Sequence, residues 1–305
     1  MSNEIRFDGK VVVVTGAGSG LGRSHALEFA KRGAKVVVND LGGSAFGDGA
    51  NSQAADKVVA EIQAMKGEAV ANYDSVENGD AIIQTALDNF DRVDIVINNA
   101  GILRDVSFAK MTDQDWDLIY RVHTLGAYKV TKAAWAHMQE QGFGRIVNTS
   151  SAAGLFGNFG QANYSSAKLG LVGFTQTLAQ EGLRNNIQVN AIAPLAGSRL
   201  TETILPKEIV DALKPELVTP LVIKLCAEDN QETGSVFEVG AGWISKLRWQ
   251  RAEGEVFDAT KPLTPEMIND KWDSITDFSE PNYPNNIQDS FSVVLKNLGI
   301  ELPKG

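Results

Sequence analysis

Short runs of β-branched and aliphatic residues alternate along most of the chain with longer stretches in which apolar residues recur every three or four positions. The short runs are typical of strands buried on both faces of a parallel sheet, and the longer stretches are typical of amphipathic helices. The predicted strands are residues 10–15, 34–39, 68–72, 93–97, 144–149, 187–192 and 236–239. The predicted helices are residues 20–31, 54–65, 81–90, 116–138 and a further one that ends near residue 180. About seven strands that alternate with helices indicate an α/β domain.

The pattern changes toward the C-terminus, where tryptophans and prolines become frequent and two amphipathic segments follow. Thr264-Pro265 is typical of the start of a helix, and the second segment spans residues 287–298. Apolar stripes of this kind pack against a core or another subunit more often than they hold a cofactor. We therefore expect a main domain, residues 1–242, and a helical extension, residues 243–305, that forms a contact in a homodimer and covers the active site.

Composition and charge narrow the class of protein. The 305 residues are 43% hydrophobic, but no apolar run reaches the roughly 18 residues of a membrane-spanning helix, and charges interrupt the N-terminus where a secretion signal would be apolar. A formal net charge of −10 argues against a nucleic-acid partner or an anionic membrane, because both require a basic face. One cysteine and three histidines provide neither an internal disulfide nor a metal-ligand cluster. We expect an intracellular protein and find no targeting signal in this chain. By its sequence alone, the expected location is the cytoplasm.

A glycine-rich turn joins the first predicted strand to the first predicted helix. It reads Thr-Gly-x-x-x-Gly-x-Gly, which differs in spacing from the Gly-x-Gly-x-x-Gly dinucleotide-binding fingerprint. The amides at the start of the helix, with the helix dipole behind them, can hold a pyrophosphate, although a turn of this composition can also bind nothing. The expected cofactor contacts in this turn are Gly16, Ser19, Gly20, Leu21 and Gly22.

Asp40 ends the second predicted strand, 24 positions beyond Gly16. In dinucleotide-binding units an acid at about this distance accepts hydrogen bonds from the adenosine ribose, whereas the simpler alternative is a solvated aspartate at a strand end. Its charge would repel a 2′-phosphate, and residues 17–19 and 39–41 contain no Arg or Lys to attract one. The sequence therefore predicts NAD rather than NADP as the cofactor.

Further cofactor contacts are expected where later strands end. Asp74 follows the third strand and is placed to bond an adenine amino group. Pro194 is expected to break the sixth strand, with residues 196–201 passing over the nicotinamide. Small residues follow the fourth strand and would let the backbone lie against the middle of the cofactor: Asn99, Ala100 and Gly101.

Ser151, Tyr164 and Lys168 are the candidate catalytic residues. If Tyr164 lies at the start of a helix, Lys168 shares its face four positions later, and a nearby ammonium favours the phenolate. A phenol ordinarily has a pKa near 10, and this must fall by about three for the phenol to act as a base near neutrality. Ser151, after the preceding strand, would direct its hydroxyl at a substrate oxygen. Taken singly, these residues have plainer interpretations, a chance helical pair and a helix cap.

These motifs occur together and in a fixed order: the glycine turn, Asn-Asn-Ala-Gly at 98–101, and then Ser151, Tyr164 and Lys168. Over about residues 8–242 the chain thereby resembles the short-chain dehydrogenase/reductase family. The resemblance implies a doubly wound parallel sheet and a nicotinamide cofactor. It also implies that Tyr164 is the catalytic acid/base, that Lys168 lowers its pKa and holds the ribose, and that Ser151 positions the reacting oxygen.

His123 departs from the usual pattern of that family, which has an Asn in Asn-x-x-Gly at this place. The histidine either holds a water that the Asn would hold or only packs in the core. It belongs to a closer resemblance, to the (3R)-hydroxyacyl-CoA dehydrogenase parts of peroxisomal multifunctional enzymes. The segments that carry this closer resemblance are residues 39–43, 71–76, 101–105, 121–123, 157–164, 196–199 and 237–243.

The closer resemblance implies NAD-dependent oxidation of a (3R)-hydroxyacyl-CoA to a 3-ketoacyl-CoA in fatty-acid β-oxidation. It also implies a peroxisomal location and full-length relatives with hydratase and sterol-carrier-like domains. The alternatives are a 3-oxoacyl carrier-protein reductase, another short-chain alcohol or steroid dehydrogenase and, outside the enzymes, an NAD(H)-sensing regulatory protein. Ser245-Lys-Leu247 is internal and cannot act as a C-terminal peroxisomal address. Three nearby cations could meet the charges of coenzyme A or form an ordinary solvated run: Lys246, Arg248 and Arg251.

Overall fold

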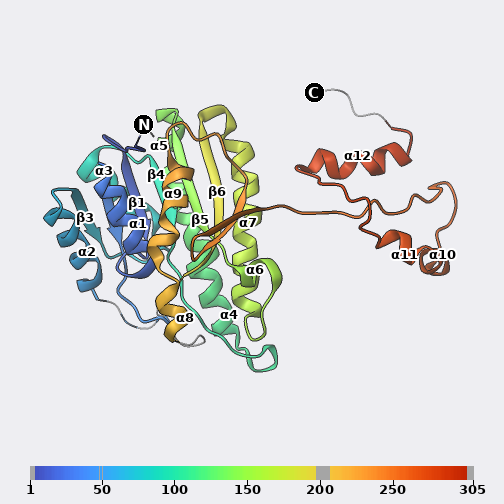
Figure 1. Ribbon diagram of the computed structural model, residues 1–305, viewed down its shortest axis with the longest axis horizontal. Coiled ribbons are helices and arrows are strands. Elements are labelled where there is room, and N and C mark those ends of the chain that lie inside the picture. Colours follow the sequence, from blue (N-terminus) through green and yellow to red (C-terminus); the bar gives the residue numbers. More distant parts are fainter. Residues whose placement is uncertain (1–3, 48, 50, 197–206, 301–305) are drawn as a thin grey trace. The chain divides into compact units, whose positions relative to one another are not determined.

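The computed structural model describes residues 4–47, 49, 51–196 and 207–300 of the chain (Figure 1). Its eight strands form one sheet in the order β3-β2-β1-β4-β5-β6-β7-β8, and the paired strands from β3 to β7 are parallel. The strand order reverses between β1 and β4, which confirms the predicted doubly wound sheet. The strands are β1 (Val11–Thr15), β2 (Lys35–Asn39), β3 (Glu68–Asn72), β4 (Ile95–Asn98), β5 (Gly144–Thr149), β6 (Ile187–Leu195), β7 (Val236–Gly240) and β8 (Trp243–Leu247).

Helices cover both faces of the sheet (Figure 1). The side chains of β1 alternate between two cores: Val12 and Val14 pack with α1, α2 and α9, whereas Val11 and Val13 pack with α3, α5 and α7. Every residue of β1 from Val11 to Val14 is fully buried, which explains why this strand is a continuous apolar run in the sequence. The helices are α1 (Gly20–Lys31), α2 (Gln53–Ala64), α3 (Gly79–Phe90), α4 (Asp113–Tyr120), α5 (Gly126–Gln141), α6 (Ala152–Phe156), α7 (Ala162–Gly182), α8 (Lys207–Ala212) and α9 (Thr219–Cys226).

One expectation about the main domain is wrong. Pro194 does not break β6, which continues to Leu195, and Pro194 pairs with Val239 of β7. A proline is tolerated near the end of a strand because few ladder hydrogen bonds remain to be lost there. The helix predicted over 116–138 is confirmed as a continuous helical stretch, in which a π-helical turn, Arg121–Leu125, joins α4 and α5. A π turn inserts one extra residue and so redirects the side chains within it.

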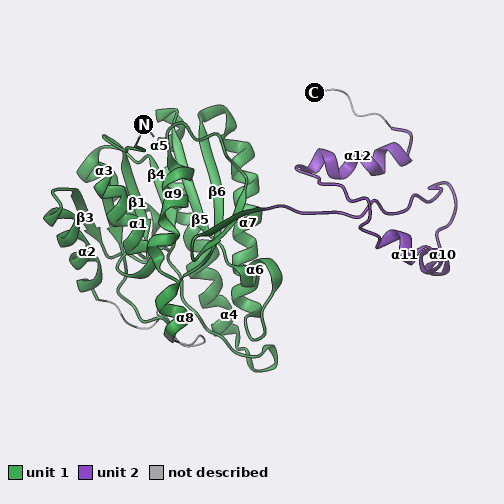
Figure 2. Cartoon of the chain, viewed as in Figure 1, with its two compact units in different colours: residues 1–246 green, residues 247–305 purple. Residues whose placement is uncertain are grey.

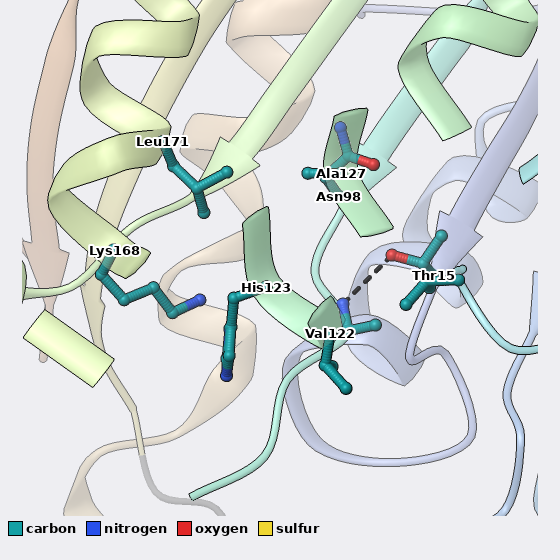
Figure 3. Close-up of a pocket in the computed structure, with 9 residues that line it drawn as sticks. Thr15, Asn98, Val122, His123, Ala127, Lys168 and Leu171 are labelled. Carbon is teal, nitrogen blue, oxygen red and sulfur yellow. Dashed lines mark hydrogen bonds between the residues drawn. The ribbon is translucent and has the colours of Figure 1, made fainter. Parts of the chain in front are cut away.

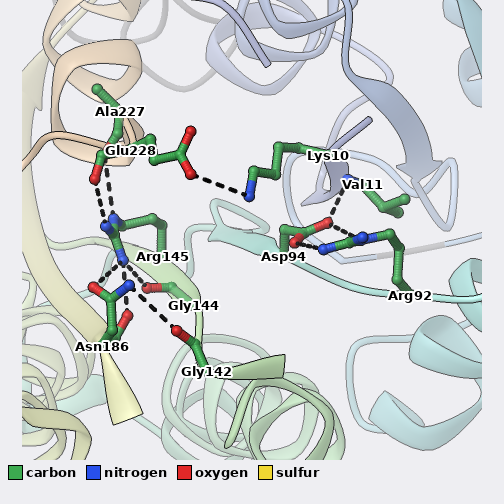
Figure 4. A network of polar contacts seen from close by, with 10 residues as sticks. All are labelled: Lys10, Val11, Arg92, Asp94, Gly142, Gly144, Arg145, Asn186, Ala227 and Glu228. Carbon is green, nitrogen blue, oxygen red and sulfur yellow. Dashed lines mark hydrogen bonds and ion pairs between the residues drawn. The ribbon is translucent and has the colours of Figure 1, made fainter. Parts of the chain in front are cut away.

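A polar network closes the edge of the sheet where β1, β4 and β5 begin (Figure 4). The guanidinium of Arg145 is fully buried and donates to backbone carbonyl oxygens, including those of Asn186 at 2.8 Å and Glu228 at 3.0 Å. Nearby, the Asp94 carboxylate accepts from the Arg92 guanidinium and from the amide of Val11, the latter at 2.8 Å. Ligands of open parallel sheets bind at the opposite edge, outside the carboxyl ends of the strands.

The chain divides into two compact units, residues 1–246 and 247–305 (Figure 2). This boundary lies four residues later than the one expected, because Trp243–Leu247 forms β8 on the sheet. β7 and β8 are joined by a two-residue turn in which Ala241 and Gly242 both have positive φ, as hairpin turns require. In the described residues, no helix is long and apolar enough to span a membrane.

The second unit contains α10 (Pro265–Asp270), α11 (Trp272–Ile275) and α12 (Ile287–Asn297). Thr264 caps α10 and Asn286 caps α12 by accepting hydrogen bonds from backbone amides, so both predicted helices are confirmed. None of the residues in these three described helices is buried, and Trp272 and Phe291 are 57% and 53% exposed. Exposed apolar side chains of this kind indicate a surface that binds a partner.

We predict that removal of residues 247–305 lowers both the oligomeric state and the melting temperature, because we expect the apolar side chains of that unit to form subunit contacts. Light scattering and thermal unfolding of the full chain and of a chain ending at Lys246 would measure this. A chain that lacks only residues 301–305 is the control. An unchanged mass and melting temperature after removal of the unit would show that it has no role in assembly.

Candidate active site

Glycines shape the turn between β1 and α1, at the edge of the sheet where the strand order reverses. Gly16 and Gly20 have φ of +63° and +54°, a region that other residues rarely adopt. A Cβ on Gly16 would lie 2.7 Å from the Cα of Ala100, and a Cβ on Gly18 would lie 2.7 Å from the Oδ2 of Asp40. The turn therefore requires glycine in order to lie against the ends of β4 and β2.

Thr15 and Asn99 connect the ends of β1 and β4 by hydrogen bonds. The Thr15 hydroxyl accepts from the amides of Asn99 and Ala100, at 3.0 and 3.1 Å. The Asn99 side chain donates to the carbonyl oxygens of Thr15 and Gly16, at 3.0 and 3.1 Å. A Cβ on Gly22 would overlap Gly16 and Asn99. Asn99 and Gly22 thus build the turn. Sequence reasoning missed Thr15, whose only signal was its place directly before the first glycine.

The start of α1 fits a pyrophosphate group. Ser19 is the residue that precedes the helix, Gly20 begins it, and its first turn contains no acidic residue to neutralise the positive end of the dipole. Leu21 packs against the core on one side of the sheet, so its contribution to a ligand is limited to its backbone amide. The twelve-residue helix therefore presents the amides that the sequence indicated.

Asp40 and Asp74 lie at the ends of the two strands beyond β1. Asp40 accepts hydrogen bonds from the backbone amides of Gly18 and Gly42, both at 2.7 Å, and is thereby anchored beside the glycine turn. Asp74 accepts from the side-chain amides of Asn72 at 2.9 Å and Asn78 at 3.2 Å. Both carboxylates belong to the same edge of the sheet, and a dinucleotide laid along that edge from α1 would pass them.

The structure brings Ser151, Tyr164 and Lys168 together. Ser151 is the N-cap of α6 and accepts a hydrogen bond from the amide of Ala153 at 3.2 Å, so the cap interpretation of this serine is also correct. Tyr164 and Lys168 lie in the first two turns of α7, and the Lys168 Nζ is 5.5 Å from the centroid of the Tyr164 ring. That ammonium donates to the carbonyl oxygen of Thr149 at 2.6 Å, which ties α7 to the end of β5.

Burial controls the protonation of this pair. It raises the pKa of Tyr164 to about 12, with the Ser151 hydroxyl acting in the opposite direction and the charge of Asp105 adding to the rise. Burial also lowers the pKa of Lys168 to about 7. In the chain by itself the cost of placing a charge in a buried site therefore dominates the pKa of Tyr164, and the expected lowering of that pKa by Lys168 stays a prediction.

His123 lies in the π turn, with its ring edge-on to the ring of Tyr164 at a centroid distance of 5.2 Å. Its Nε2 is 2.9 Å from the carbonyl oxygen of Ile102. A Cβ on Gly101 would lie 2.5 Å from the Cε1 of the same ring, so Gly101 makes room for the histidine. Burial and the charge of Lys168 hold the pKa of His123 well below its ordinary value, although the bond to Ile102 acts against this, and the ring is neutral at pH 7.

A small cavity of about 10 Å³ lies behind these residues (Figure 3). Two atoms of its lining residues, His123 Nδ1 and Asn98 Oδ1, are buried and have no hydrogen-bond partner within the described part of the chain. A cavity of this size has room for about one water molecule. The residues that line it are Thr15, Val76, Asn98, Ala100, Val122, His123, Ala127, Lys168 and Leu171.

Pro194, the expected nicotinamide loop and the three cations after the sheet have weaker links to the site. Pro194 lies at the carboxyl end of β6, whereas residues 197–201 of the expected nicotinamide loop lie outside the described residues. Each of the three cations near the end of the sheet has a partner within the chain. Lys246 pairs with Glu232, Arg248 lies over the ring of Tyr283, and Arg251 donates to Asn282. Among the described residues, no three His, Cys, Asp or Glu side chains gather as metal ligands.

Known proteins resemble the chain over nearly its whole length. Peroxisomal multifunctional enzyme A of Dictyostelium discoideum is 62% identical over 95% of this chain and 65% of its own length. The structure of full-length peroxisomal multifunctional enzyme type 2 from Drosophila melanogaster matches 97% of this chain and 50% of that one, with 43% identity and a TM-score of 0.83. The chain thus spans about half to two thirds of the length of these relatives.

A more distant structure has a nicotinamide cofactor in its title. It is 7α-hydroxysteroid dehydrogenase complexed with NADH and 7-oxo glycochenodeoxycholic acid, which covers 79% of this chain and is itself covered to 97%, with 28% identity and a TM-score of 0.71. Residues 10–206 also match the short chain dehydrogenase family, and this range includes the glycine turn and the three catalytic candidates. With this match and this site, the chain belongs to the short-chain dehydrogenase/reductase family and is a nicotinamide-dependent dehydrogenase.

Proposed function

We propose that the chain oxidises the 3-hydroxyl group of a (3R)-hydroxyacyl-CoA to the 3-ketone with NAD, as a step in fatty-acid β-oxidation. The observation that carries the proposal is the partly buried Tyr164 beside both Ser151 and Lys168, at the sheet edge that holds the glycine turn. The acyl-CoA substrate is supported by the similarity to peroxisomal multifunctional enzymes and by the segments of closer resemblance, such as residues 101–105 and 157–164.

In this proposal Tyr164 takes the proton of the 3-hydroxyl group, and the Ser151 hydroxyl bonds the same oxygen and holds it in place. Lys168 stays fixed by its bond to Thr149 and holds or releases a proton beside the tyrosine, since its pKa is about 7. Bound NAD supplies the hydride acceptor and a positive charge that opposes the rise in the tyrosine pKa.

His123 has a positioning role in the proposal. Its Nε2 is engaged by Ile102, so its Nδ1 is the atom that faces a water in the cavity shared with Lys168 and Asn98. A neutral histidine can bond such a water as donor or acceptor, depending on the tautomer. The water then connects the lysine to the interior of the π turn. This favours the interpretation that His123 holds a water, as the usual Asn of the family would, over the interpretation that it only packs in the core.

The choice of NAD over NADP rests on Asp40 in the proposal. Two backbone amides hold its carboxylate next to the glycine turn, where its remaining lone pairs can accept from the ribose hydroxyls. A 2′-phosphate at that position would meet the same negative charge. The protein is further proposed to act as a homodimer in the peroxisome. It is also proposed to be fused, in a longer enzyme, to hydratase and sterol-carrier-like domains.

Tyr164→Phe should lower kcat by at least about three decades and leave NADH binding nearly unchanged, because it removes the proton acceptor and little of the binding surface. Steady-state rates and a fluorescence titration with NADH measure the two effects. Tyr128→Phe, at an exposed position of α5, is the matched control. Retention of about a tenth of the wild-type rate would exclude Tyr164 as the base.

Asp40→Asn should reduce the ratio of kcat/KM for NAD to kcat/KM for NADP by about tenfold or more, because the repulsion of the 2′-phosphate is lost. Asp88→Asn removes an equal charge from an exposed position on α3 and should leave the ratio unchanged. If both variants keep the wild-type ratio, the discrimination between cofactors comes from another part of the site.

The wild-type protein should oxidise (3R)-hydroxyacyl-CoAs and reject the (3S) epimers. With Ser151 and Tyr164 both bonded to the oxygen at C3, only one configuration directs its hydrogen at the nicotinamide. Initial rates of NADH formation with each epimer test this. Comparable rates on the two epimers would contradict the proposed substrate while leaving the dehydrogenase assignment intact.

A further inference from the structure

Residues 104–106, which follow β4, are hydrogen-bonded to the start of α7, next to Tyr164. The amide of Val106 donates to the carbonyl oxygen of Gly160 at 2.8 Å. The side chain of Asn163 donates to the carbonyl oxygen of Arg104 at 3.2 Å. Asp105 lies between these two anchor points. Its backbone is therefore held beside the first turn of the helix that carries the tyrosine.

Asp105 is itself held in one orientation by a buried amide. Gln161 is only 5% exposed, and its Nε2 donates to the Oδ2 of Asp105 at 2.7 Å. The Oε1 of Gln161 accepts from Asn158 at 2.9 Å, so both ends of this amide are engaged. Asp105 as a whole is exposed, and among the described residues it forms no ion pair. A fixed negative charge thus faces solvent at the start of α7.

That charge acts on the catalytic tyrosine. It raises the pKa of Tyr164, in addition to the larger effect of burial and against the effect of Ser151. Lys168 and His123 also lie against the Tyr164 ring. The Lys168 ammonium is directed to Thr149, and the His123 ring is neutral. The negative charge of Asp105 therefore acts on the phenol in the opposite sense to the nearby Lys168 ammonium.

We propose that Asp105 is a specificity-determining residue that rejects free 3-hydroxy acids and admits their neutral thioesters. The inference rests on the proposed function. When the 3-hydroxyl group is bonded to Tyr164, C1 lies only two bonds from the reacting carbon. A free acid has a full negative charge at C1, close to the phenol on which Asp105 acts, whereas a thioester is neutral there. The carboxylate therefore discriminates by the charge at C1 between two substrates that share the same 3-hydroxyacyl group.

The test compares (3R)-3-hydroxybutyrate with its N-acetylcysteamine thioester, which lacks the nucleotide of coenzyme A, in oxidation by NAD. In Asp105→Asn the amide oxygen still accepts from Gln161, so the fold of the segment is kept. The ratio of kcat/KM for the acid to kcat/KM for the thioester should rise about 10- to 100-fold. Asp117→Asn, at an exposed position of α4, should leave this ratio unchanged. An unchanged ratio in Asp105→Asn, or an equal change in Asp117→Asn, overturns the inference.

A second measurement needs no substrate. Tyrosinate absorbance is titrated with pH in the wild type and in Asp105→Asn, and the contribution of Tyr164 is obtained by subtraction of Tyr164→Phe. The Tyr164 midpoint should move to lower pH in Asp105→Asn, because a negative charge near the phenol is lost. An unmoved midpoint overturns the inference whatever the substrate. If the midpoint moves but the wild type oxidises no (3R) thioester, the proposed function fails and the action of Asp105 on the tyrosine stands.

Discussion

The hydrogen bonds of Thr15 and Asn99, which join the ends of β1 and β4, are the constraint on which the rest of the site depends. Two parallel strands that meet at the reversal of the sheet leave their last amides without ladder partners, and the Thr15 hydroxyl accepts from two of them. The Asn99 side chain satisfies the opposing carbonyl oxygens. With those groups bonded, the glycine turn can face outward toward a ligand.

The same junction positions the catalytic helix. The chain leaves β4 through Gly101, against which the ring of His123 packs, and that ring in turn lies edge-on to Tyr164. A few residues later, the bonds from Asn163 to Arg104 and from Val106 to Gly160 hold the first turn of α7. The sheet edge that carries the glycine turn and the catalytic tyrosine are thus joined by one continuous set of contacts. A displacement of the β4 end would change both.

Burial, more than any single ion pair, sets the electrostatics of the site. It raises the pKa of Tyr164 and lowers that of Lys168 to about 7, so near neutral pH the phenol by itself stays protonated and the lysine is only partly protonated. A positive charge on a bound cofactor would add to that of Lys168 in favouring the phenolate. The fixed carboxylate of Asp105 acts in the opposite sense. Charge on the substrate and cofactor consequently has a large influence on catalysis.

The sequence by itself determined the order of strands and helices, because β-branched runs and periods of three to four residues are local properties of the chain. It also placed Tyr164 and Lys168 on one helix face. Only the tertiary structure decided that Pro194 stays within β6, that a π turn directs His123 at Gly101, and that Gln161 holds Asp105 from 56 positions away. It also decided the direction of the Tyr164 pKa. These features depend on burial and on contacts between distant segments, and neither is encoded in the spacing of neighbouring residues.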